Sequence, residues 1–389
     1  MNYLKMDNHN LLKSNPFKYG GVVTDPNFID REIEIPELTQ SLAGGSNLIL
    51  YSPRRFGKTS LIRKVAENLE KIDIQVLYFD LFQVSTRDQF LALYYQAIIK
   101  KSTRWEKSLK MISALVKSVR PVIRVENDGS PVVSLEIDRH NQQQSFSEIV
   151  GLPEQLAGKK RWVVIFDEFQ EVENFGGEMF EKELRSVIQH HQKVSYVLMG
   201  SKKHMLLSMV TRKNRAFYNF GKLFYLNKIA AEKWERYIRK GFDPLRLPYE
   251  QELIRRVIET AENIPYYVQY LAFEMIECAL FSKALDESTL QMALNRVNNN
   301  QEDYFLSLWE SLSITQQKTL GALAIDNKNV FSREFLDKYQ IQTASGVQRS
   351  IAVLMHRGLI DKQQGQFVFE DPFFSRWITG RGAGKLASW

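Results

Sequence analysis

The stretch YSPRRFGKTS, residues 51–60, joins a short apolar run to a segment with helical periodicity. The run is LILY at 48–51, and the segment after the loop reads SLIRKVAENLEK. A strand, a loop ending in Gly-Lys-Thr and a helix direct backbone N–H groups at bound phosphates. Ser52 replaces the usual first glycine of such a loop. We expect serine to be tolerated if its φ stays negative, because Pro53 stiffens the same turn.

A second apolar run, WVVIFDE at 162–168, ends in two acidic residues. Together with the loop, it predicts a site for a nucleoside triphosphate. Lys58 would neutralise the β- and γ-phosphates, and Thr59 and Asp167 would hold Mg²⁺. Glu168 would polarise the attacking water. The predicted nucleotide-binding loop consists of Ser52, Pro53, Arg54, Arg55, Phe56, Gly57, Lys58, Thr59 and Ser60.

The apolar run SYVLMGS, 195–201, supplies one more candidate catalytic residue, Ser201. Its hydroxyl would orient water or sense the γ-phosphate, or else it is the N-cap of the helix that follows. The two arginines of the loop are also open to more than one interpretation. Arg54 and Arg55 are candidates for a contact with phosphate, as are Arg212 and Arg215. Alternatively, Arg54 and Arg55 form salt bridges to the sheet edge or to Glu168.

Further strands at 75–80 and 223–227, with helices between the strands, predict an α/β domain with a parallel sheet. A helix is expected from about 88 to 118, followed by a hairpin ending near 138. After residue 228 the periodicity is helical only. From residue 313, short helices and a hairpin over QQGQ predict a winged helix. The expected domains are an ATPase domain at 1–228, a helical lid at 229–312, a winged helix at 313–380 and a tail at 381–389.

The composition is that of an ordinary globular protein, with 44% hydrophobic and 25% charged residues. No apolar run approaches the roughly 18 residues that span a bilayer, and no signal peptide is evident, so we expect a cytoplasmic protein without a membrane partner. The net charge is +7, and basic residues cluster at 100–124 and 202–215. These two segments are either solvated helix faces or a surface for nucleic acid. The single cysteine, Cys278, argues against a disulfide or a cysteine-based zinc cluster.

Motifs along nearly the whole chain resemble those of the archaeal-type ATPase family. This family is related to the signal-transduction ATPases with numerous domains and to the origin-recognition branch of the AAA-type ATPases. The matching motifs are NPFKYG, FIDRE, SPRRFGKTSLI, IFDEFQEV, LMGSKKHM, NIPYYVQYLA and DPFFSRWI. The resemblance implies that Phe28, Ile29, Asp30, Arg31 and Glu32 wrap the adenine, and that Pro265 and Tyr266 cover it from the other side. Asn263 stands where the family's Gly-x-Pro has glycine. Gly221-Lys222 stands where family members often have Gly-Arg, so no arginine finger is assigned.

Two functions fit these features. The first is a Mg²⁺-dependent ATPase that acts as a nucleotide-driven switch and associates with double-stranded DNA through the winged helix and the two basic segments. The polar face of its third helix would present Ser345, Gln348 and Arg349. The second is a signalling scaffold whose ATP state controls assembly with itself or with a protein partner, without DNA. Residues 301–389 hold ten basic and nine acidic residues, which does not favour DNA. A small-molecule kinase is disfavoured, because a kinase does not need a winged helix.

Overall fold

The computed structural model describes residues 15–23, 27–101, 112–125, 131–137, 141–363 and 365–385. Its contacts divide the chain into two compact units. The sheet unit comprises residues 31–52 and 58–227. The helical unit comprises residues up to 30, residues 53–57 of the phosphate loop, and residues from 228 onward. The predicted boundaries within the helical unit remain predictions.

The sheet unit is built on five parallel strands in the order β2-β5-β6-β1-β7. Their bounds are β1 Leu48–Tyr51, β2 Gln75–Asp80, β5 Trp162–Asp167, β6 Val194–Gly200 and β7 Lys222–Tyr225. The register pairs Tyr51 with Gly200 and Asp80 with Asp167. The carboxyl ends of β1, β2, β5 and β6 therefore lie along one edge, which is where ligands bind in open parallel sheets. The predicted parallel α/β sheet is confirmed.

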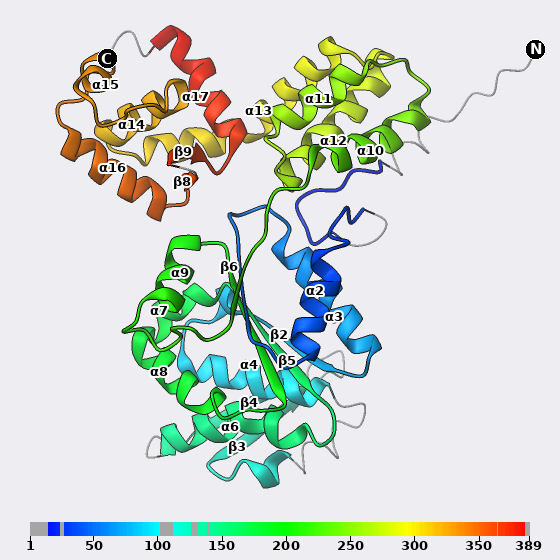
Figure 1. The fold of residues 1–389 in the computed structure, drawn as a ribbon, viewed down its shortest axis with the longest axis vertical. Helices are drawn as coiled ribbons and strands as arrows, with labels where there is room; N and C mark the ends of the chain where they lie inside the picture. The colour runs from blue at the N-terminus through cyan, green and yellow to red at the C-terminus, as the bar shows by residue number, and fades with distance from the viewer. Residues whose placement is uncertain are drawn as a thin grey trace, which may run out of the picture. The chain divides into compact units, whose positions relative to one another are not determined.

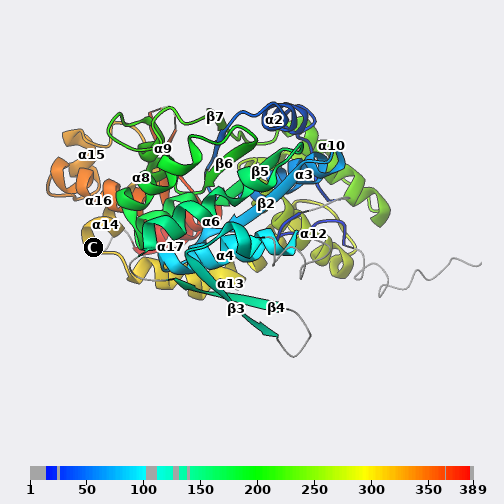
Figure 2. The same cartoon turned by 90° about the horizontal axis from the view of Figure 1, so that it is seen from below.

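Helices cover both faces of this sheet (Figures 1 and 2). Alternate residues of β5 show why: Val164 and Phe166 belong to one large core cluster with α4, α6 and α8, whereas Val163 and Ile165 are equally buried outside it. The helices of the unit are α2 Glu34–Ala43, α3 Lys58–Lys71, α4 Arg87–Lys100, α6 Gln142–Leu156, α7 Val172–Phe175, α8 Gly177–Ile188 and α9 Lys203–Thr211, with 3-10 turns η1 Leu81–Gln83 and η3 Phe169–Glu171.

The predicted hairpin is present as β3 Val119–Val125 and β4 Pro131–Ile137, which pair antiparallel. The helix expected from 88 to 118 is instead interrupted: α4 ends at Lys100, and residues 102–111 lie outside the described residues. Most of the basic segment 100–124 therefore has no described side chains.

The helical unit contains α10 Ala231–Phe242, η4 Asp243–Leu245, α11 Gln251–Thr260, α12 Pro265–Ser282 and α13 Glu287–Glu310. They are followed by α14 Ile314–Ile325, α15 Arg333–Lys338, α16 Ala344–His356, the hairpin β8 Ile360–Gln363 and β9 Gln366–Phe369, and α17 Pro372–Lys385. Three helices and a hairpin match the winged helix that the sequence predicts. Capping boxes at Asp286 and Ser313 begin α13 and α14. No helix in the described part of the chain has the length and apolar character needed to cross a membrane.

Candidate functional site

Lys58 is the first residue of α3 and is almost completely buried, with 6% exposure. Its Nζ donates to the backbone oxygen of Ser52 at 2.9 Å and to Ser52 Oγ at 3.3 Å. Ser52 is not among the residues with positive φ, whereas Gly57 has φ 85°. The serine therefore takes the turn without strain, as expected, and its hydroxyl adds an acceptor for the lysine that glycine would lack.

Thr59 and Asp167 are brought together from α3 and from the end of β5. Thr59 Oγ1 donates to Asp167 Oδ2 at 3.1 Å, and Tyr78 of β2 donates to the same oxygen. Burial raises the pKa of the Asp167 carboxyl, and the neighbouring Glu168 charge adds to that rise, while the Tyr78 and Thr59 hydrogen bonds oppose it. One hydroxyl and one carboxylate beside a buried lysine form a donor set that fits Mg²⁺ bound with a nucleotide.

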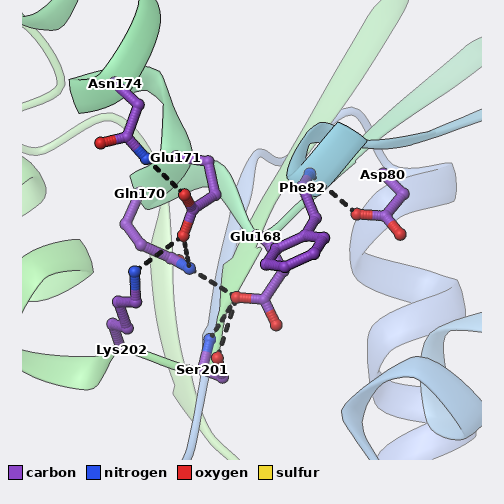
Figure 3. A network of polar contacts seen from close by, with 8 residues as sticks. All are labelled: Asp80, Phe82, Glu168, Gln170, Glu171, Asn174, Ser201 and Lys202. Atoms are coloured by element: carbon purple, nitrogen blue, oxygen red, sulfur yellow. Dashed lines mark hydrogen bonds and ion pairs between the residues drawn. The ribbon is translucent and has the colours of Figure 1, made fainter. Parts of the chain in front are cut away.

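Glu168 follows β5 in a left-handed conformation with φ 50° and ψ 45°. This conformation is uncommon for glutamate and costs about 1–3 kcal/mol, and such residues cluster at functional sites. Its Oε2 accepts hydrogen bonds from Ser201 N at 3.2 Å and from Ser201 Oγ at 2.9 Å. Gln170 Nε2 donates to the same oxygen (Figure 3). The carboxylate is thus held from two neighbouring strand ends.

Ser201 is not the N-cap of α9. The N-cap position is Lys202, without a side-chain capping bond, and the Ser201 hydroxyl is instead directed at Glu168. That alternative from the sequence is wrong, because the adjacent strand end offers the hydroxyl a charged acceptor. The role of Ser201 in orienting water or sensing phosphate remains a prediction.

The middle of the phosphate loop belongs to the helical unit. Arg55, with φ 67°, forms an ion pair with Asp371 at 2.9 Å and donates to the hydroxyl of Tyr267. Its guanidinium carbon lies 4.5 Å from the ring centroid of Tyr266. The backbone N–H of Arg54, whose side chain is exposed, is 3.4 Å from Glu370 Oε2. Arg55 therefore pairs with Asp371 and not with the sheet edge or Glu168, and its contact with phosphate remains a prediction.

The remaining loop residues differ in exposure. Pro53 and Phe56 are buried, whereas Ser60, in the first turn of α3, is half-buried. Their expected contact with nucleotide remains a prediction.

The segment expected to wrap adenine is divided between the units. Phe28 and Ile29 are half-buried in the helical unit. Arg31, in the sheet unit, is buried and donates to Glu34 and to the backbone oxygen of Asn227, each at 2.7 Å. Pro265 is the first residue of α12, and Tyr266 N donates to the backbone oxygen of Arg55 at 3.3 Å. Contact of these residues with adenine remains a prediction.

Asn263, where the family has glycine, takes a left-handed φ of 58°. Asparagine tolerates this region better than most residues, which explains how it can replace glycine there.

Acidic residues from other elements partly neutralise the basic segment 202–215. Lys202 Nζ lies 2.9 Å from Glu171 Oε1. Arg215 pairs with Glu181 of α8, and also with Glu173 and Glu178. The sequence shows no acid within this segment, but the fold places α7 and α8 beside it. Arg215 is therefore a structural ion-pair residue here, while Arg212 and Lys213 are exposed.

Three residues of this site were not predicted from the sequence: Tyr78, Gln170 and Asp371. Gln170 and Asp371 lie within motifs that carry the family resemblance, IFDEFQEV and DPFFSRWI, so the motifs held a signal for them. The sequence held no such signal for Tyr78, because it lies between the apolar residues Leu77 and Phe79 in an ordinary strand.

Comparison with known proteins identifies the class. Residues 28–271 match an ATPase domain predominantly from Archaea, and residues 303–380 match a probable winged helix domain. The first match covers more than half of the chain, so this chain belongs to that archaeal ATPase family. The resemblance inferred from the motifs is confirmed.

Curated relatives in Methanocaldococcus jannaschii are named as uncharacterized ATP-binding proteins. One is 27% identical over 162 residues, covering 39% of this chain and 42% of its own length. Another is 28% identical over 159 residues, covering 38% of this chain and 40% of its own length. The chain thus spans less than half the length of these relatives.

Solved structures share the fold across the chain. A Walker-type ATPase of Pyrococcus abyssi has a TM-score of 0.64 and 16% identity, covering 94% of this chain and 99% of that one. The Aeropyrum pernix ORC2 protein, described in ADPNP and ADP complexes, has a TM-score of 0.53 and 15% identity, covering 94% and 98%. At these identities the similarity shows the fold alone.

We expect the buried Arg215–Glu181 ion pair to be important for the stability of the sheet unit. The side chains are 9% and 1% exposed, so Arg215→Met leaves a buried carboxylate without its cation. We expect the free energy of unfolding of the sheet unit to fall by about 3–5 kcal/mol at neutral pH. Urea unfolding followed by hydrogen exchange of α8 measures this loss, with exposed Arg212→Met as the control.

The loss of stability in the Arg215→Met variant should depend on pH. Burial raises the pKa of Glu181, and the hydrogen bond and charge of Arg215 lower it, so Arg215→Met raises it further. The folded chain then binds the proton more tightly than the unfolded chain, and stability rises as pH falls. The deficit relative to wild type should therefore shrink from pH 7 toward the acid range, and Glu181→Gln should reduce it. A deficit independent of pH would contradict this assignment.

Proposed function

We propose that this chain binds ATP with Mg²⁺, hydrolyses it slowly, and uses the nucleotide state to change the contacts of its winged helix. The observation that carries the proposal is the arrangement of Lys58, Thr59 and Asp167 at one edge of the sheet, with Thr59 and Asp167 in hydrogen-bond contact. Membership of the ATPase family supports it. The names of the curated relatives and the nucleotide complexes of the ORC2 protein point to the same ligand.

The residues divide the chemistry between them. Lys58 and the backbone N–H groups of the loop bind the phosphates, and Thr59 and Asp167 hold the metal. Mg²⁺, when bound, neutralises charge on the phosphate oxygens. Glu168 accepts a proton from the attacking water, and Ser201 holds its carboxylate. Phe28, Ile29, Pro265 and Tyr266 enclose the adenine.

The link between nucleotide and output runs through Arg55. Its backbone lies in the phosphate loop, and its side chain binds Asp371 at the start of α17 and the tyrosines of α12. Burial disfavours the guanidinium charge, but Tyr267 and Asp371 favour it, and the pKa of Arg55 is raised. A change of loop conformation on binding phosphate therefore acts directly on the winged helix and the lid.

Two substitutions test the chemistry. Lys58→Ala should weaken ATP binding at least about tenfold, because a hydrogen bond to a charged group contributes roughly 1.5–3 kcal/mol. Glu168→Gln should retain ATP binding and lower kcat by about a hundredfold to ten-thousandfold. Fluorescent-nucleotide titration and phosphate release measure these effects. Hydrolysis by Glu168→Gln at the wild-type rate would show that another residue activates water, and a phosphorylated acceptor would indicate a kinase.

The proposed link from Arg55 to Asp371 can be tested separately. In the wild-type chain, ATP should change hydrogen exchange at residues 370–374, because Arg55 links them to the loop. Asp371→Asn removes the ion pair and should abolish that response. Asp337→Asn, at an exposed aspartate of the winged helix, should keep it. An equal response to ATP in both variants would exclude Arg55–Asp371 as the link.

Double-stranded DNA is the proposed partner of the switch, and a protein is the alternative. Ser345, Gln348 and Arg349 are exposed on α16, as the sequence predicts. A pocket of about 400 Å³ between the N-terminal ends of α14 and α16 is lined by Lys318 and Arg349. These cations near two helix N-termini favour a phosphate backbone.

Fluorescence anisotropy of a duplex at several salt concentrations separates the two partners. If DNA binds here, Arg349→Ala should weaken binding and reduce the salt slope by about 1, whereas Arg333→Ala, at an exposed position of α15, should have little effect. Absence of DNA binding at physiological salt, together with an ATP-dependent oligomeric state, would favour the signalling scaffold.

A further inference from the structure

Gln170 holds the carboxylate of Glu168, although it belongs neither to the phosphate loop nor to the predicted metal ligands. All three hydrogen bonds that the described residues donate to the Glu168 carboxylate go to Oε2: two from Ser201 and one from Gln170 Nε2. Among the residues that the structure describes, Oε1 receives none. These bonds fix one of the two carboxylate oxygens of Glu168.

Gln170 is well placed to impose this orientation because it cannot move freely. It lies in the turn η3, immediately after β5, and is only 1% exposed. Its amide nitrogen also lies 3.4 Å from Glu171 Oε1, so the neutral amide donates between two carboxylates. Figure 3 shows Gln170 between these two side chains.

A second brace holds Glu171 in place. Its Oε1 accepts from Lys202 Nζ at 2.9 Å, and its Oε2 accepts from Asn174. Glu171 is 8% exposed, so these charge-assisted bonds form in a largely dry environment, where they are strong. Through Glu171, the position of the Gln170 amide is tied to α7 and to the start of α9.

Gly200, at the end of β6, makes room for the Gln170 amide. A Cβ added at this glycine would overlap with Gln170 Oε1 and lie 3.2 Å from Gln170 Cδ, whereas the nearest atom of another residue, Leu206 Cδ2, would be at an ordinary 3.6 Å. The φ of Gly200 is not positive, so alanine is compatible with the backbone. The absence of a side chain at position 200 therefore serves the placement of Gln170 and not the geometry of the strand.

We propose that Gln170 is the positioning residue for Glu168, and that Gly200 is required because it accommodates the Gln170 amide. The inference rests on the proposed hydrolysis of ATP and deepens it. Gln170 orients the water-activating carboxylate without touching the nucleotide. Its loss should therefore change the rate of the chemical step and leave nucleotide binding intact.

The test measures kcat and ATP affinity separately in Gln170→Ala and Gly200→Ala. Each should lower kcat by about tenfold to a hundredfold, the scale expected when a catalytic group is misplaced by roughly 1 Å. The dissociation constant of a fluorescent ATP analogue should stay at the wild-type value. Gln170→Met, which keeps the side-chain volume but removes the donor, guards against a folding defect, and circular dichroism checks each variant.

The double variant gives the sharpest result. Once Gln170 is shortened, a methyl group at position 200 has nothing to displace, so Gly200→Ala should cost little further activity in the Gln170→Ala chain. If Gly200→Ala lowers kcat equally in both backgrounds, or if Gln170→Met turns over at the wild-type rate, Gln170 does not position Glu168.

Glu168→Gln separates this inference from the proposed function. If Glu168→Gln is inactive and Gln170→Met is fully active, hydrolysis stands and only the positioning role is contradicted. If Glu168→Gln is fully active, or the wild-type chain does not hydrolyse ATP, the assigned chemistry and the positioning role are contradicted together.

Discussion

The parallel register of β1, β2, β5 and β6 is the constraint on which the rest of the site depends. Because all these strands run the same way, their carboxyl ends meet at one edge, and the ends of β1, β5 and β6 each contribute a polar residue to the site. Ser52 follows β1, Asp167 ends β5 and Ser201 follows β6. Burial of both faces under helices makes this register costly to change, since a slip of one residue would exchange the residues on the two faces.

At that edge, the groups proposed for catalysis and binding are held by partners to which no chemical step is assigned. Tyr78 bonds to Asp167, Ser52 bonds to Lys58, and Gln170 bonds to Glu168. A carboxylate that accepts several hydrogen bonds loses freedom before a substrate arrives, so less reorganisation is needed in the transition state. The left-handed backbone at Glu168 fits the same interpretation, because strain of this kind persists only where its surroundings fix it.

Local patterns were sufficient for most of the fold. The apolar runs at 48–51 and 75–80 coincide with β1 and β2, and the helix expected after the loop is α3, which begins at Lys58. Such features are predictable because hydrophobic periodicity and turn chemistry act over a few residues. Local patterns were not sufficient where a side chain has both nearby and distant possible partners. Ser201 bonds to Glu168 and does not cap α9, and Arg215, in the basic segment 202–215, pairs with Glu181 of α8.

The sequence by itself determined the class of fold, the phosphate loop, and the acidic pair at the end of β5, because each is written in contiguous residues with a fixed local geometry. Tertiary structure alone decided what holds these groups. Arg55 and Asp371 are separated by 316 positions, and the Gln170 amide occupies space that a side chain at Gly200, on the adjacent strand, would fill. Such contacts depend on strand order and packing across the chain, which no local pattern encodes.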